Sequence, residues 1–167
     1  MSVLKNDRDL SPLEFLNHAV KLQGMLKEFA QRNFGLRDTS EFIKKKYRYE
    51  KDDLTEYDAN YYLLTSSKRN IDSLCKLMLS NLRRANSIYP QNLHELQNRK
   101  DLQDLAIGNC EAIIGALQEV VETFEVDVNR YKQYIEAIDR EIWLIKRWRR
   151  SDNKLKNRLK RNEMGNI

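Results

Sequence analysis

The chain has 167 residues, the length of one ordinary domain, and contains only 5 glycines and 2 prolines. Together these make up about 4% of the chain, whereas average proteins contain roughly 12%. Because the turns of β-sandwiches and β-barrels depend on glycine and proline, this shortage argues against a many-stranded β fold. An apolar fraction of 41% and a charged fraction of 33% exclude a disordered chain and a membrane protein.

The net charge of +5 is distributed unevenly along the chain. Residues 146–167 contain nine Lys or Arg and two acids, which gives +7. Residues 1–145 contain the other 21 basic and 23 acidic side chains, which gives −2. Such an asymmetry predicts an anionic partner for the carboxyl-terminal end.

The first predicted helix opens with Ser11-Pro12-Leu13-Glu14, in which serine caps the helix and glutamate can bond back to the cap. Apolar residues then recur at spacings of four and three, at Phe15, Ala19, Leu22, Leu26 and Phe29. We expect this helix to end near Asn33 or Gly35.

The second predicted helix follows an irregular segment. Residues 36–65 are predicted as a loop or insertion with a basic cluster at Lys44–Lys46. The helix is expected to begin between Asp58 and Ser67 and to stop before Pro90. Its apolar stripe consists of Ile71, Leu74, Cys75, Met78, Leu82, Ala85 and Ile88.

The third predicted helix covers residues 92–124, with Asn92 as its cap and Glu95 three residues later. Gly108 and Gly115 lie seven residues apart inside it, and therefore on one face. Because glycine costs about 1 kcal/mol in a helix relative to alanine, we expect a neighbouring helix to approach closely at that face.

The fourth predicted helix opens at Asp127, a natural cap. Its apolar residues form a heptad seam of Tyr131, Ile135, Ile138, Ile142 and Ile145. From Arg149 onward the basic tail either continues this helix or frays, and the sequence leaves both open.

These elements predict an all-α fold, an antiparallel up-down four-helix bundle with an insertion between the first two helices. Residues 1–150 would form the bundle, and residues 151–167 a basic carboxyl-terminal tail. The connections around Pro90 and Glu125 are short, which favours antiparallel neighbours.

The sequence contains no catalytic motif. It has two histidines, His18 and His94, and no Glu-x-x-His pair, Cys-x-x-Cys pair or glycine-rich phosphate loop. We therefore predict no catalytic residues, no cofactor and no metal site. Cys75 and Cys110 are predicted to be buried free thiols of a reduced cytoplasm, with a disulfide or metal site as the alternative. The absence of a long apolar run and of a signal peptide also predicts a cytoplasmic protein without membrane contact.

The segment Trp143-Leu144-Ile145-Lys146-Arg147-Trp148-Arg149-Arg150 is the most unusual in the chain. Cations attract phosphate backbones, and tryptophan and arginine planes stack on unpaired bases. The alternative is a solvated helix end whose cations suit the helix dipole. The candidate nucleic-acid-binding residues are Arg83, Arg84, Lys146, Arg147, Arg149, Arg150, Lys154 and Lys156.

Three segments, 81–90, 106–111 and 141–154, resemble the four-helix-bundle family that includes the accessory variability determinants (Avd) of diversity-generating retroelements. Related bundles are encoded by intervening sequences of ribosomal RNA genes. The resemblance covers roughly residues 11–154. It implies a bacterial, phage or prophage element and a non-enzymatic homopentamer that binds a reverse transcriptase, template-repeat RNA and cDNA. Such proteins support mutagenic reverse transcription.

Two other functions compete with this interpretation. One is an interaction scaffold with no nucleic-acid role, which would dock proteins through exposed aromatic residues, namely Tyr47, Tyr49, Tyr61, Tyr62 and Trp148. The other is a metal-dependent enzyme of the ferritin-like type.

Trp143, Leu144 and Trp148 lie outside the heptad seam, and such surplus apolar surface would favour subunit contact.

Overall fold

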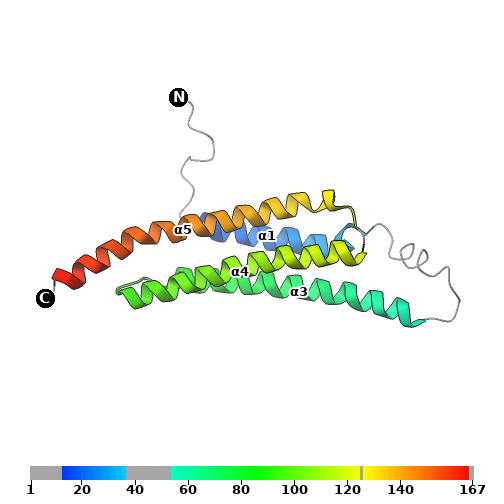
Figure 1. The fold of residues 1–167 in the computed structure, drawn as a ribbon, viewed down its shortest axis with the longest axis horizontal. Coiled ribbons are helices and arrows are strands. Elements are labelled where there is room, and N and C mark those ends of the chain that lie inside the picture. Colours follow the sequence, from blue (N-terminus) through cyan, green and yellow to red (C-terminus); the bar gives the residue numbers. More distant parts are fainter. Residues whose placement is uncertain (1–12, 37–53, 125, 166–167) are drawn as a thin grey trace, which may run out of the picture.

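The computed structural model describes residues 13–36, 54–124 and 126–165, and within these ranges it is helical without strands (Figure 1). Four long helices account for most of it: α1 (Glu14–Gln31), α3 (Leu54–Ser87), α4 (Leu93–Phe124) and α5 (Lys132–Gly165). Two single 3₁₀ turns lie between them, η2 (Asn33–Gly35) and η3 (Val128–Arg130).

The four helices pack as a bundle. α3 packs against α1 and α4, and α5 packs against the same two helices, so α1 and α4 separate α3 from α5. Figure 1 shows all four lying along the long axis of the molecule. The prediction of an all-α helical bundle is thus confirmed.

The core is formed by the apolar stripes that periodicity predicts. Every member of the α1 stripe is buried, and of the α5 seam Tyr131, Ile138 and Ile145 are buried. Cys75 and Cys110 are buried free thiols, as predicted. Burial raises the pKa of the Cys75 thiol to about 12 and also raises that of Cys110, so neither thiol is a reactive nucleophile near neutral pH.

The helix ends agree with the sequence in part. α3 stops at Ser87, before Pro90, and the Asn92 side chain accepts a hydrogen bond from the backbone N–H of Glu95 at 2.9 Å. Asp127 caps the short η3 turn, so α5 begins five residues later than predicted, at Lys132. The predicted cap at Ser11 and the Lys44–Lys46 cluster lie outside the described residues.

Two of the long helices extend well beyond their apolar stripes. α3 begins at Leu54, so the predicted start between Asp58 and Ser67 is wrong and the last part of the predicted 36–65 insertion is helical. No glycine or proline occurs between Gly35 and Pro90, so nothing stops the packed helix from extending toward its amino-terminal end. α5 runs without a break into the basic tail as far as Gly165.

The close helix approach predicted at Gly108 and Gly115 is absent. A Cβ added at either glycine would meet nothing within 4 Å, and Gly108 is exposed. The two glycines do share a face, but it is an outer face of α4. They therefore carry the helix cost of glycine without a close contact at the Cβ position from any residue that the structure describes.

A buried acid–base pair connects α1 to α5. Glu141 is fully buried, and its Oε2 lies 2.7 Å from Nδ1 of His18. Burial raises the pKa of the Glu141 carboxyl above its usual range, although the hydrogen bond and charge of His18 act in the opposite direction. Its other carboxylate oxygen has no hydrogen-bond partner within the described ranges.

Replacing Gly108 with alanine should raise the free energy of unfolding by about 0.5–1 kcal/mol, because it removes backbone entropy at an open helical site. Urea unfolding of Gly108→Ala, with Gly24→Ala as a second open glycine, measures this. A destabilised Gly108→Ala alone would show that the α4 glycine face contacts another chain.

The Glu141→Gln substitution should alter how stability depends on pH. A carboxyl whose pKa is raised by folding contributes stability at low pH, and this stability decreases as the pH rises through the raised value. Relative to Glu141→Gln, the wild type should therefore lose free energy of unfolding as the pH rises from the unfolded-state pKa of glutamate, about 4.3, through the raised pKa in the fold. A difference that stays constant across urea titrations in this range would contradict the burial effect.

Candidate nucleic-acid interface

The first turns of α4 are joined to α5 by a buried polar cluster. Asp152 is only 4% exposed, and its two oxygens take different partners from α4. Oδ1 pairs with Nη2 of Arg99 at 3.2 Å, and Oδ2 accepts a hydrogen bond from Nε2 of Gln103 at 3.0 Å. Arg99 also donates to the backbone carbonyl of Ile88 at 3.3 Å. These contacts set the register between α5 and α4.

Trp148 reinforces the same junction from its other side. Its ring stacks on Phe15 of α1 with centroids 3.9 Å apart, and the Arg99 guanidinium lies 4.8 Å from the ring centroid. Trp148 is therefore not the exposed aromatic that the scaffold hypothesis expects. Leu144 is buried as well, so most of the predicted surplus apolar surface of α5 packs inside this chain.

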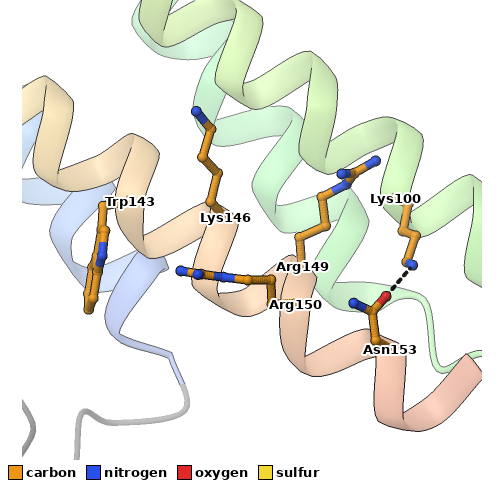
Figure 2. A pocket seen from close by; sticks show the side chains of 6 residues that line it. All are labelled: Lys100, Trp143, Lys146, Arg149, Arg150 and Asn153. Carbon is orange, nitrogen blue, oxygen red and sulfur yellow. Dashed lines mark hydrogen bonds between the residues drawn. The ribbon is translucent and has the colours of Figure 1, made fainter.

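Beside this cluster lies an open recess of about 370 Å³ between α4 and α5. Figure 2 shows Lys100 of α4 reaching toward Asn153 of α5, where its Nζ donates to Oδ1 at 3.1 Å. The recess is lined by Lys100, Trp143, Lys146, Arg149, Arg150 and Asn153. Four of these six side chains are cationic.

Little negative charge balances the recess. Arg149 forms an ion pair with Asp104 at 2.7 Å, and both side chains are partly exposed. Of the ion pairs seen in the described residues, none involves Lys100, Lys146 or Arg150. Burial lowers the pKa of Lys100, and the nearby charges of Lys156 and Arg149 lower it further, while Asp152 and Asp104 act in the opposite direction. An anion in the recess would relieve this repulsion.

The recess brings together three of the predicted residues: Lys146, Arg149 and Arg150. Arg147 instead lies against the Trp143 ring, 5.4 Å from its centroid, while Arg140 lies at 4.6 Å. Trp143 is thus available to a ligand only where these two guanidinium groups leave its ring uncovered.

The remaining predicted residues lie elsewhere. Lys154 and Lys156 are exposed further along α5. Arg83 and Arg84 are exposed on α3, whose main packing partners are α1 and α4, and neither lines the recess. Sequence reasoning missed Lys100 and Asn153. The one signal that could have pointed to Lys100 is Gln103, a polar residue on the apolar stripe of α4.

Asp152→Asn should destabilise the protein by about 3 kcal/mol, because it leaves the Arg99 guanidinium, whose side chain is 15% exposed, without a counter-charge. Asp104→Asn is a matched control, since it removes an exposed pair between the same two helices and should cost less than about 1 kcal/mol. Urea unfolding of both variants makes the comparison. Equal decreases in stability would mean that the Asp152 pair is not an essential contact.

Neither a metal-binding group of three His, Cys, Asp or Glu residues nor a helix long and apolar enough to cross a membrane occurs in the described ranges. Comparisons with protein-family models, with curated proteins and with solved structures found no match for this chain.

Proposed function

We propose that this protein is a non-enzymatic nucleic-acid-binding protein whose recess between α4 and α5 contacts the phosphate backbone. The observation that supports this most directly is that Lys100, Lys146 and Arg150 line one recess and have no acidic partner among the described residues. Neutralising phosphates with such side chains releases counterions, which drives binding.

The net charge of the chain's end supports the same proposal. The recess opens onto α5, the helix that carries the +7 end of the chain. A compact region of one sign raises the local concentration of an oppositely charged polymer and speeds its association. Because the rest of the chain has a net charge of −2, a nucleic acid would be directed to this end.

Within this function, the resemblance to the Avd family supports a more specific role. We propose an accessory protein of a diversity-generating retroelement in the cytoplasm, which binds a reverse transcriptase, template-repeat RNA and cDNA. The proposal includes antiparallel up-down connectivity, favoured by the short links after α3 and α4, and a homopentamer. The scaffold alternative retains Tyr62, which is 70% exposed, but not Trp148.

The double variant Lys146→Gln/Arg150→Gln should weaken binding of single-stranded RNA about tenfold. The slope of log affinity against log salt should become shallower by about 1.4, since roughly 0.7 is expected for each phosphate that is no longer neutralised. Fluorescence anisotropy with a labelled RNA at several salt concentrations measures both quantities. Lys21→Gln/Lys27→Gln is the matched control, because it removes two exposed cations from α1 and should change neither.

In the same assay Asp104→Asn should act in the opposite direction, because it frees Arg149 to contact a phosphate. Unchanged affinity in both recess variants would reject the recess as the interface. The retroelement role has a separate test: where a reverse transcriptase is encoded beside this gene, its cDNA yield is measured with and without the protein. No effect on that yield would reject the role and leave nucleic-acid binding standing.

A further inference from the structure

Beyond the recess, α5 continues as a strongly basic helix that we call the basic arm, residues 154–162. In Figure 1 this red end of α5 extends past the nearby ends of α3 and α4. The arm contains no acidic residue, and five of its nine residues are exposed cations: Lys154, Lys156, Arg158, Lys160 and Arg161. None of the five forms an ion pair with any residue that the structure describes.

The arm has two different sides. Leu159 is buried and Leu155 is half-buried, and as residues four apart they form one apolar side. Asn157 lies almost opposite Leu159 on a helix of 3.6 residues per turn. Asn157 is therefore at the centre of the outer side, with Arg161 and Lys160 beside it on the next turn.

The outer side thus presents an amide surrounded by cations. Asn157 is exposed. Its side-chain amide makes no hydrogen bond to another described residue, and its backbone carbonyl accepts from Nε of Arg161 at 3.3 Å. Asn153, one turn earlier, is also exposed and faces the same way. The arm has no aromatic residue, although proteins that hold single strands commonly stack bases on aromatic rings.

We propose that the basic arm binds in the major groove of double-stranded DNA, with Asn157 contacting a base edge and the cations contacting the flanking phosphates. An α-helix with side chains is about 10–12 Å across, which fits the major groove of B-DNA, about 12 Å wide. The major groove of double-stranded RNA is too narrow for side chains to read. Asparagine pairs its amide with the N6 and N7 positions of adenine.

This inference rests on the proposed nucleic-acid binding but not on the retroelement role. It makes the arm different from the recess: the recess contacts phosphates alone, and the arm adds a sequence preference. Phosphate contacts position a protein on a duplex, whereas contacts to base edges specify the sequence. The two contributions can be separated by their dependence on salt.

The test uses the full chain and a DNA duplex selected from a randomised library for tightest binding. Arg158→Gln/Arg161→Gln should weaken duplex binding and reduce the salt slope by about 1.8, at roughly 0.9 for each phosphate contact. Asn157→Ala should weaken binding to the selected duplex about tenfold and leave the salt slope unchanged. Lys21→Gln/Lys27→Gln is again the control, and circular dichroism checks that each variant keeps its helix content.

A modified duplex tests whether the major groove is read. Replacing adenines of the selected site with 7-deazaadenine removes N7 from the major groove and leaves the minor groove intact. Wild-type affinity should fall, by no more than Asn157→Ala lowers it because N6 remains, and the modification should have no further effect on Asn157→Ala. This agreement would support the inference.

The other outcomes separate the inference from the proposed function. Equal affinity for duplex DNA and duplex RNA, or a full effect of 7-deazaadenine in Asn157→Ala, would overturn groove binding by the arm. Duplex DNA binding that is unchanged in Arg158→Gln/Arg161→Gln, with single-stranded RNA binding that still depends on Lys146 and Arg150, would also overturn it, while the proposed function stands. If neither RNA nor DNA binds, both proposals fail.

Discussion

The buried pair between Arg99 and Asp152 is the contact on which the basic end of this molecule depends. It holds α5 in one register against α4 and thereby places Lys100 opposite Asn153. A shift of α5 by one turn, about 5.4 Å, would separate the α5 cations from Lys100 and abolish the recess. The basic arm begins two residues after Asp152, so its direction is set by the same contact.

A buried ion pair is an expensive way to fix a register. Removing two charges from water costs several kcal/mol for each ion, and well-packed apolar residues would often be at least as stable. Here the cost is reduced by Gln103, which donates to Asp152, and by Trp148, whose ring lies against Arg99. Apolar side chains could pack equally well in several registers, whereas this pair is satisfied in one. We therefore infer that the pair is present because it specifies a single register between α4 and α5.

The sequence predicted the parts of this structure that depend on local spacing. The apolar stripes of α1 and α5, the stop before Pro90 and the Asn92 cap each follow from residues within a few turns of one another. The recess does not, because it requires the register between α4 and α5, which is set by contacts distant in sequence. In the sequence, nothing distinguishes Lys100 from a solvated lysine. Its place in the recess depends on the Asp152 contact, which brings Asn153 beside it. The close helix approach predicted at Gly108 and Gly115 is wrong for a related reason. Periodicity shows that the two glycines share a face of α4, but not whether that face points outward.

The cations of α5 repel one another. Folding has to overcome this repulsion, and a bound anion at this end would reduce it. Burial lowers the pKa of Lys100, and repulsion from Lys156 and Arg149 adds to this effect. Asp104 and Asp152 offset it in two ways: Asp152 is buried and holds the helices together, whereas Asp104 is exposed and screens Arg149. A polyanion that displaces Asp104 from Arg149 and leaves the Asp152 pair in place would stabilise the bundle, by an amount that grows with the logarithm of its concentration above the Kd. The two acids thus have separate places: Asp152 is buried between α4 and α5, whereas Asp104 is exposed beside Arg149.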